Sequence, residues 1–306
     1  MWACCGQGDI TLWHAQTRWS GKLTKPIKLP PAHKEDVRAI LVVKADDASR
    51  SVVWTGDPSG LINVWSVKKK GKVSSKIKKI RINRPVESIY QYRDTIWVGT
   101  DGVIFVFNAK THECIRMWAA HNGLINDMVC CGAYMWSCGQ DYTICIWDPN
   151  DVRVHRAPCN TVACTLFSLN GHRHRLRSSW SLVALQPLSE EPVKRIKGHT
   201  SKVFCLLTVD HYVWSGSFDT SIIIWSGATF DFVQELKGAH TDGVRSLLRV
   251  APESVWSGAM QSDGRIAQWI VPRPPRPPTV ALNHSPRTVA RAMASLHLAQ
   301  KGVVEV

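Results

Sequence analysis

Tryptophan recurs along this chain in pairs of nearly fixed spacing. Fourteen of the 306 residues are tryptophan, and four pairs lie eleven residues apart. These pairs are Trp2 and Trp13, Trp54 and Trp65, Trp136 and Trp147, and Trp214 and Trp225. Trp256 and Trp269 repeat the pair with two extra residues, and Trp97 and Phe107 repeat it with one fewer. A spacing that recurs along the whole chain predicts a structure built from repeated units.

Each unit has the pattern of two short β-strands joined by a tight turn. Segments 213–217 (VWSGS) and 221–225 (SIIIW) are rich in β-branched and aromatic residues, and segments 135–139 and 143–147 repeat the pattern. The second aromatic residue of each unit follows the previous one after 40 to 52 residues, apart from one interval of 78. The sequence therefore predicts an all-β chain of hairpins with a period of roughly 40 residues.

A histidine precedes four of the units, with a hydrophobic residue four positions later. The pairs are His33 and Val37, His121 and Ile125, His199 and Val203, and His240 and Val244. Gly198-His199 opens one unit, and Trp147-Asp148 closes another. With these dipeptides, residues 1–270 resemble the WD40-repeat β-propeller family, whose blades of about 40–45 residues carry Gly-His near the start and Trp-Asp at the end.

The resemblance implies an all-β fold, a WD-repeat β-propeller of seven four-stranded antiparallel blades with one or two of them degenerate or incomplete. In that family a histidine, a serine or threonine, a turn aspartate and the tryptophan form a hydrogen-bonded set within a blade. The matching residues are His121, Ser137, Asp141 and Trp147, then His199, Ser215, Asp219 and Trp225, and then His240, Ser257, Asp263 and Trp269. Such a set provides partners for a buried indole N–H and imidazole.

Three units depart from this pattern at their polar positions. The unit that ends at Trp65 has Ser59 in place of the turn aspartate. The unit 97–107 has Asp101 but neither the histidine nor the serine, and the first unit also lacks its polar members. We therefore expect strands in these units without a complete set of four.

Two stretches allow two interpretations each. Residues 151–192 form either a degenerate blade or an insert in one connection. Residues 271–306 form a proline-rich linker and tail after the propeller range 1–270. In one interpretation 281–296 pairs beside residues 1–5 and closes the ring. In the other, the chain is a fragment of a larger protein and the tail is only a linker.

Basic residues exceed acidic ones by 38 to 24, which gives a formal net charge of +14. Nine of them gather between residues 68 and 84 with no acidic residue among them. They are Lys68, Lys69, Lys70, Lys72, Lys76, Lys78, Lys79, Arg81 and Arg84. Because like charges repel, we expect a projecting, solvated loop that runs into a strand. It is a candidate phosphate-binding segment for anionic lipid, RNA or a phosphorylated partner, and the alternative is a solubilising loop or a nuclear-import signal.

Motifs for catalysis and for cofactor binding are missing from the sequence. The P-loop, HExxH, GxSxG and kinase patterns do not occur. Ser, His and Asp recur in unit after unit beside a tryptophan, which favours a structural role over a catalytic triad. Cys159 and Cys164, with the histidines of 172–177, do not have the spacing of a zinc site. The sequence therefore predicts no catalytic residue, no metal site and no cofactor.

These observations predict a non-catalytic scaffold or adaptor that binds other proteins through the rims of a propeller. The alternatives are a recruitment module for anionic lipid or RNA that uses segment 68–84, and the propeller part of a larger signalling enzyme. No apolar run is long enough for a transmembrane helix, and no secretion signal is recognisable, so we expect a cytoplasmic or nuclear location. The sequence leaves the oligomeric state open.

Overall fold

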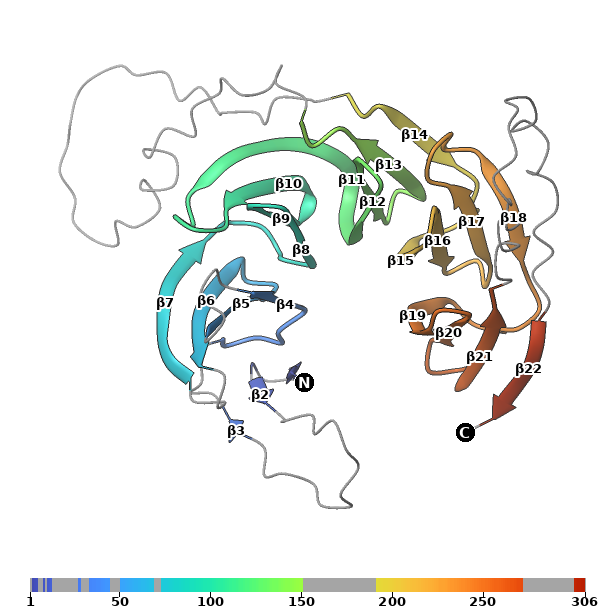
Figure 1. Ribbon diagram of the computed structural model, residues 1–306, viewed down its shortest axis with the longest axis horizontal. Helices are drawn as coiled ribbons and strands as arrows, with labels where there is room; N and C mark the ends of the chain where they lie inside the picture. Colours follow the sequence, from blue (N-terminus) through green and yellow to red (C-terminus); the bar gives the residue numbers. More distant parts are fainter. Residues whose placement is uncertain are drawn as a thin grey trace, which may run out of the picture. The chain divides into compact units, whose positions relative to one another are not determined.

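The computed structural model describes residues 2–4, 8, 10–12, 27–28, 33–44, 50–68, 73–150, 191–271 and 300–305. The elements of this part are β-strands joined by turns, and Figure 1 shows them side by side in small antiparallel sheets. No helix among these residues has the length and hydrophobicity needed to cross a membrane. The chain divides into two compact units, residues 1–198 and residues 199–306.

The first unit contains a three-stranded, a four-stranded and a seven-stranded sheet. The three-stranded sheet consists of β1 (Trp2–Cys4), β2 (Ile10–Leu12) and β3 (Ile27–Lys28). The four-stranded sheet consists of β4 (Ala39–Lys44), β5 (Arg50–Gly56), β6 (Leu61–Lys68) and β7 (Val73–Arg81). The seven-stranded sheet consists of β8 (Ser88–Tyr92), β9 (Thr95–Gly99), β10 (Asp101–Asn108), β11 (Cys114–Cys131), β12 (Tyr134–Gly139), β13 (Thr143–Trp147) and β14 (Lys194–Lys197).

The seven-stranded sheet contains two repeats that share the long strand β11. Residues 114–124 of this strand pair with β10, and residues 125–131 pair with β12. One continuous strand is therefore the fourth strand of one repeat and the first strand of the next.

The second unit contains two four-stranded sheets. The first consists of β15 (Val203–Val209), β16 (Tyr212–Ser217), β17 (Ile222–Ser226) and β18 (Phe232–Leu236). The second consists of β19 (Val244–Ala251), β20 (Ser254–Ala259), β21 (Arg265–Ile270) and β22 (Gln300–Glu305). The strand β22 comes from the tail and pairs with β21, with Arg265 opposite Glu305. The segment 281–296, which the sequence interpretation placed beside residues 1–5, lies outside the described residues.

The long connection in the first unit begins and ends in one sheet. Strand β13 pairs directly with β14, with Thr143 opposite Lys197 and Ile146 opposite Lys194. Residues 148–193 therefore link the third and fourth strands of the same repeat, as an insert in a hairpin connection does. Residues 151–190 themselves lie outside the described part of the chain.

One residue of each hairpin turn has a left-handed backbone conformation. It lies five positions before the second aromatic residue in six units, with φ between 62° and 79°. These residues are Gly8, Gly60, Gly102, Tyr142, Thr220 and Gly264. Glycine adopts this conformation without strain, and a Cβ at Gly60 would lie only 1.7 Å from the Ile82 carbonyl oxygen. The same turn geometry therefore recurs through the repeats, although two units build it with a tyrosine or a threonine.

The first tryptophan of a pair is almost fully buried in most units. The buried residues of this kind, each at most 2% exposed, are Trp54, Trp97, Trp136 and Trp214. The ring centroid of Trp54 lies 5.9 Å from that of Phe107, which belongs to the following repeat. Trp256 is an exception at 40% exposed. Its neighbour Val255 packs in a cluster with Trp214, and alternation along the strand turns Trp256 to the opposite face of its sheet.

Candidate functional site

A network of four side chains joins the strands within single sheets. In sheet β15–β18 the indole N–H of Trp225 donates to Ser215 Oγ over 2.8 Å. His199 Nε2 lies 2.8 Å from the same oxygen, and His199 Nδ1 lies 2.9 Å from Asp219 Oδ2. The backbone N–H of Thr200 also donates to Asp219 over 2.8 Å. The network thus ties the segment before the sheet to a strand and to the hairpin turn.

The structure brings the other two predicted sets together in the same way. His121 Nδ1 lies 3.0 Å from Asp141 Oδ1, and His121 Nε2 lies 2.8 Å from Ser137 Oγ. Trp147 donates to the same serine oxygen over 2.9 Å. Contacts of 2.7–2.8 Å join His240, Ser257, Asp263 and Trp269.

A fourth network occurs in sheet β4–β7, where the sequence pattern left the set incomplete. His33 Nδ1 donates to Asp57 Oδ2 over 2.6 Å, and His33 Nε2 lies 2.8 Å from Thr55 Oγ1. Trp65 donates to the same threonine oxygen over 3.1 Å. Asp57, two positions before Ser59, is the missing aspartate, and it accepts hydrogen bonds from the Ser59 N–H and hydroxyl. Its place beside the threonine, outside the expected turn position, is why sequence comparison missed it.

The histidine of the β11–β14 network is positively charged at neutral pH. Burial opposes the charge, but the hydrogen bond and the charge of Asp141 outweigh it, and Cys145 adds to them, so that the pKa of His121 rises to about 9. Burial likewise opposes ionisation of Asp141, yet hydrogen bonds from His121 and its other donors hold the pKa of this carboxyl well below its usual range. His121 therefore donates from both ring nitrogens, to Asp141 and to Ser137.

The histidine of the β4–β7 network is neutral by contrast. Burial lowers the pKa of His33, and the positive charges of Lys76 and Lys79 lower it further, against the opposing effect of Asp57. The Asn63 amide nitrogen lies 3.0 Å from His33 Nε2 and donates to it, which requires an unprotonated ring nitrogen. The same four-residue framework thus occurs in two charge states.

The repeat that ends at Phe107 has no such network among the described residues. The indole N–H of Trp97 donates instead to Thr95 Oγ1 over 3.1 Å. Asp101 is exposed at the start of β10, and its backbone carbonyl accepts a hydrogen bond from Arg84 over 2.7 Å. Within the described ranges, the Asp101 side chain has no histidine partner of the kind found in the four networks.

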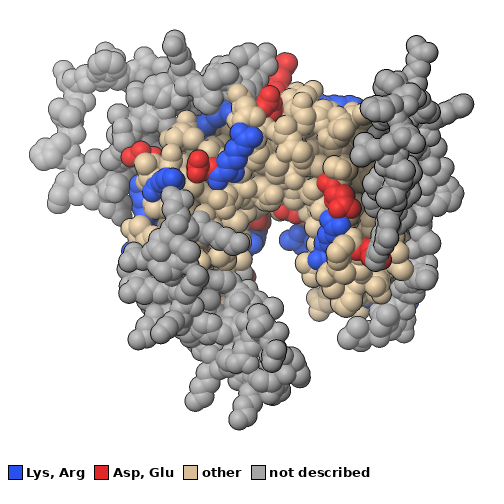
Figure 2. All heavy atoms as spheres, viewed as in Figure 1, with Lys and Arg blue, Asp and Glu red and all other residues tan. Residues whose placement is uncertain are grey.

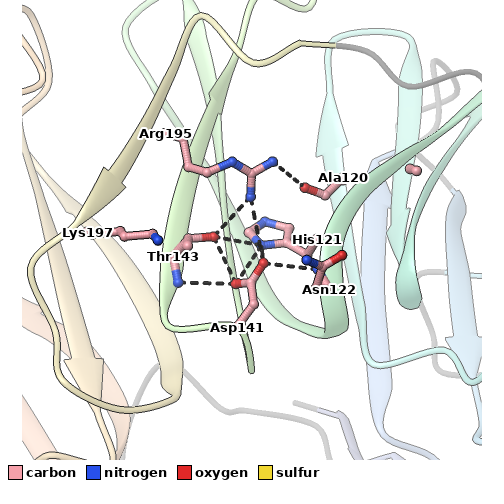
Figure 3. A pocket seen from close by; sticks show the side chains of 8 residues that line it. Ala120, His121, Asn122, Asp141, Thr143, Arg195 and Lys197 are labelled. Carbon is pink, nitrogen blue, oxygen red and sulfur yellow. Dashed lines mark hydrogen bonds and ion pairs between the residues drawn. The ribbon is translucent and has the colours of Figure 1, made fainter.

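An open pocket of about 290 Å³ lies beside the His121 network (Figure 3). Its lining residues are Ala119, Ala120, His121, Asn122, Asp141, Thr143, Arg195 and Lys197. They come from the middle of β11, from the turn before β13, from the start of β13 and from β14. Two segments more than 40 residues apart in the sequence therefore meet in one pocket.

Arg195 is fixed across this pocket by three contacts. Its guanidinium donates to the Ala120 carbonyl over 3.1 Å and to Thr143 Oγ1 over 3.2 Å. It also lies 3.7 Å from Asp141 Oδ2, while its side chain stays 39% exposed. Figure 3 shows the guanidinium extended over Asp141 and Thr143. The planar group is therefore pre-organised and still open to solvent.

The pocket carries an excess of positive charge. Arg195, Lys197 and the protonated His121 face the single ionised carboxylate of Asp141, which leaves two positive charges in excess. Lys197 is exposed, and within the described part of the chain its side chain makes no hydrogen bond or ion pair. Such a pocket attracts an anionic group, above all a carboxylate or a phosphate.

Segment 68–84 runs into a strand, as the sequence predicts, and the strand begins earlier than expected. Residues 73–81 form β7, the last strand of sheet β4–β7, and Lys68 ends β6. Backbone pairing with β6 orders the segment, because β-branched Val73, Ile77 and Ile80 favour a strand despite the charge. Lys76, Lys78, Lys79, Arg81 and Arg84 are thus held on or directly after a strand. Lys69, Lys70 and Lys72 lie outside the described residues, as do Cys159, Cys164, the histidines of 172–177 and the prolines of 272–278.

Comparisons with known proteins give matches of two kinds, although no protein-family model matches the chain. Among curated proteins it is 26% identical over 155 residues to the probable serine/threonine-protein kinase roco7 of Dictyostelium discoideum. That match covers 50% of this chain but only 4% of the relative. Among solved structures, the chain resembles the WD40 β-propeller domain of Doa1 with a TM-score of 0.60 and 14% identity, covering 88% of this chain and 74% of the other.

A second solved structure has a similar fold. The chain resembles a chain of the mitotic checkpoint complex with a TM-score of 0.65 and 15% identity, covering 100% of this chain and 76% of the other. The recurring four-stranded antiparallel sheets, with their His–Ser/Thr–Asp–Trp networks, agree with this likeness. This chain therefore has the WD40-repeat β-propeller fold.

Proposed function

We propose that this protein is a non-catalytic interaction platform that binds an acidic segment of a partner protein. The observation that carries the proposal is the positively charged pocket at β14, in which Arg195 is held in place while its guanidinium remains accessible. The pocket is built on strands whose tryptophans are buried. A rigid site loses little conformational freedom on binding, which favours recognition of a partner.

The state of the histidines supports a non-catalytic role. A Ser–His–Asp triad needs a neutral imidazole that accepts the serine proton. His121 is instead protonated, and Ser137 Oγ accepts hydrogen bonds from both His121 and Trp147. Ser137 is also only 1% exposed. The hydroxyl is therefore buried and already committed to two donors, as a structural group is.

The chemistry of the pocket suits a carboxylate from a glutamate or aspartate side chain. The remaining N–H groups of Arg195 offer a planar fork that matches a carboxylate, and Lys197 adds a mobile charge on the same strand. Charge complementarity of this kind accelerates encounter and rejects basic partners.

Affinity capture from cells with single charge reversals tests the proposal. The variants are Lys197→Glu in the pocket and Lys202→Glu, an exposed lysine just before β15, as the matched control. A partner captured by the wild-type chain is then purified and titrated against each form. We expect Lys197→Glu to weaken binding by about tenfold and Lys202→Glu to leave it nearly unchanged. Equal binding by both variants would exclude the pocket as the contact, and absence of any stoichiometric partner would contradict the platform role.

A second candidate function rests on the match to the much longer kinase roco7, of which this chain spans 4%. In this alternative the propeller is one module of a larger signalling protein. Sequencing of full-length transcripts tests it. A reading frame that joins these residues to a kinase domain would support the alternative, and transcripts that encode only these residues would exclude it.

A further inference from the structure

A β-bulge in β7 changes which basic residues share a face of the strand. Lys78 lies opposite Val64 and Lys76 lies opposite Trp65, so that Ile77 is an extra residue without a partner in β6. Strict alternation along the strand would place Lys76 and Lys78 on one face. The bulge breaks that alternation, and Lys76 instead joins the face of Lys79.

Contacts on the two faces agree with this assignment. Lys76 Nζ lies 5.6 Å from the centroid of the Trp65 ring. Both Lys76 and Lys79 act on the pKa of His33, which belongs to the network on the Trp65 side. Lys78 is on the other face, where its ammonium group donates to the Thr111 carbonyl over 3.3 Å.

Arg81 extends the first of these faces. Arg81 lies opposite Leu61, and Lys79 lies opposite Asn63. Because these pairs are two residues apart on both strands, Arg81 and Lys79 share a face. The outer strand therefore presents three basic side chains in a row, Lys76, Lys79 and Arg81, and all three are exposed. None of them forms an ion pair with a carboxylate among the described residues. We call this row the β7 basic face.

An exposed apolar side chain interrupts the basic row. Ile77, the bulged residue, is 45% exposed between Lys76 and Lys78. Trp65 is only 3% exposed, and the ammonium group of Lys76 lies near its ring. The outer strand β7 thus combines a row of positive charges with an exposed aliphatic residue. Among the described residues of this strand and of β6 there is no open aromatic ring on which a nucleic-acid base could stack.

Protection of a sheet edge does not account for this composition. Lysines on an edge strand prevent pairing with other chains, and β7 is such a strand. The corresponding outer strand β18, however, has exposed Phe232 and Val233 and contains no basic residue. The position in the fold therefore does not itself require a row of cations. On the face shown in Figure 2, Lys and Arg lie in separate groups near Asp and Glu.

From these observations we propose that the β7 basic face binds the surface of an anionic membrane. Lys76, Lys79 and Arg81 contact the lipid headgroups, and Ile77 enters the boundary between headgroups and acyl chains. A cationic row beside an aliphatic residue is the combination by which proteins attach to such surfaces. This proposal stands apart from the pocket at β14, which involves other residues.

Vesicle sedimentation with the full chain tests the proposal. The vesicles contain phosphatidylcholine alone, or phosphatidylcholine with about one fifth phosphatidylserine, an anionic lipid. We expect binding only to the anionic vesicles, and its loss as the salt concentration rises. Each basic residue near the membrane surface contributes about fivefold in affinity, so the double variant Lys79→Gln/Arg81→Gln loses roughly 25-fold. Ile77→Ser weakens binding by several-fold without any change in charge.

The matched control removes two positive charges elsewhere. Lys202→Gln/Lys237→Gln changes two exposed lysines that flank sheet β15–β18, and we expect it to bind the anionic vesicles almost as the wild type does. Thermal melting verifies that each variant is folded. Equal loss in both double variants would show a general charge effect and overturn the site. The proposal would also be overturned if the wild-type chain bound neither kind of vesicle. The same holds if the β7 double variant lost binding to single-stranded RNA but kept binding to anionic vesicles.

Discussion

Asp57 shows how one side chain can replace a residue of the repeat from a different position. It is fully buried and accepts hydrogen bonds from His33, from the Ser59 hydroxyl and N–H, and from the Leu61 N–H. In the other networks an aspartate of the hairpin turn has this role. Ser59 stands at that turn position but acts as a donor to Asp57. A carboxylate within reach of the imidazole is thus what the network requires, irrespective of its place in the sequence.

The first prediction concerns this carboxylate. Asp57→Ala leaves the buried imidazole and the turn N–H groups without an acceptor, which should reduce the free energy of unfolding by about 3 kcal/mol. Ser59→Ala removes only one donor at a partly buried site and should cost about 1 kcal/mol or less. Urea denaturation measures both changes. Equal effects for the two variants would contradict the assignment of Asp57 to the network.

The second prediction concerns pH and the His121–Asp141 pair. The pKa of His121 is about 9 in the folded protein and 6.5 for the ordinary side chain, so the folded state binds the proton more tightly. The pair therefore stabilises the fold fully below about pH 6.5, and this contribution is lost as pH rises through about 9. The total is of the order of 3 kcal/mol. Melting temperatures across this range should fall less steeply for Asp141→Asn than for the wild type.

We expect His33 to lower the stability of the fold as the pH falls, whereas the His121–Asp141 pair loses its contribution as the pH rises. Its pKa is lowered in the folded protein, so the unfolded chain binds the proton more readily below about pH 6.5. Stability from this residue is present above that pH and falls as the solution becomes more acidic. The two networks therefore affect stability in separate pH ranges.

The hairpin turn is the element that recurs most faithfully. Six turns place a residue with positive φ at one position, and four of them use glycine there. Thr220 adopts φ of 70° with a β-branched side chain, a conformation that such residues rarely populate. The geometry of the turn is thus set by the pairing of its two strands. Most turns have a glycine at the strained position, but Tyr142 and Thr220 occupy it in two of them.

The third prediction follows from this strain. Thr220→Gly should raise the free energy of unfolding by about 1 kcal/mol, because relief of the left-handed strain exceeds the entropy that glycine adds to the unfolded chain. Gly60→Ala should lower the free energy of unfolding by several times that amount, since the alanine Cβ would overlap the Ile82 carbonyl. Chemical denaturation of the two variants checks the signs. A destabilised Thr220→Gly chain would mean that the threonine side chain contributes more than its strain costs.

At the scale of the whole molecule, stability depends on the packing of one sheet against the next. Trp214 is 1% exposed in the cluster between sheets β15–β18 and β19–β22, whereas Trp256, in the same column of the repeat, is 40% exposed. Identical residues in equivalent strands therefore differ in what covers them.

The fourth prediction compares these two tryptophans. Trp214→Ala should reduce the free energy of unfolding by about 3–5 kcal/mol, the range for a buried aromatic residue. Trp256→Ala should cost about 1 kcal/mol, since much of its ring already contacts solvent. Denaturant midpoints with unchanged slopes would establish both values. Similar losses for the two variants would indicate that Trp256 is buried in solution.

The repeated hairpins, the all-β fold and the three regular networks follow from local sequence patterns. Each of these depends on residues within about 30 positions of one another, so their spacing repeats in the sequence as it does in a sheet. Gly198-His199 and Trp225, for example, lie in one such stretch and meet in one network.

The role of Asp57, the position of Arg195 and the face of Lys76 could not be predicted from local sequence patterns and were found in the folded chain. Arg195 reaches the Asp141 pocket because β14 returns to β13 after a long connection, and no local pattern encodes that pairing. Lys76 shares a face with Lys79 because one bulged residue shifts the alternation of β7. Non-local pairing and register depend on the partner strand, and therefore these features of the site emerged only in three dimensions.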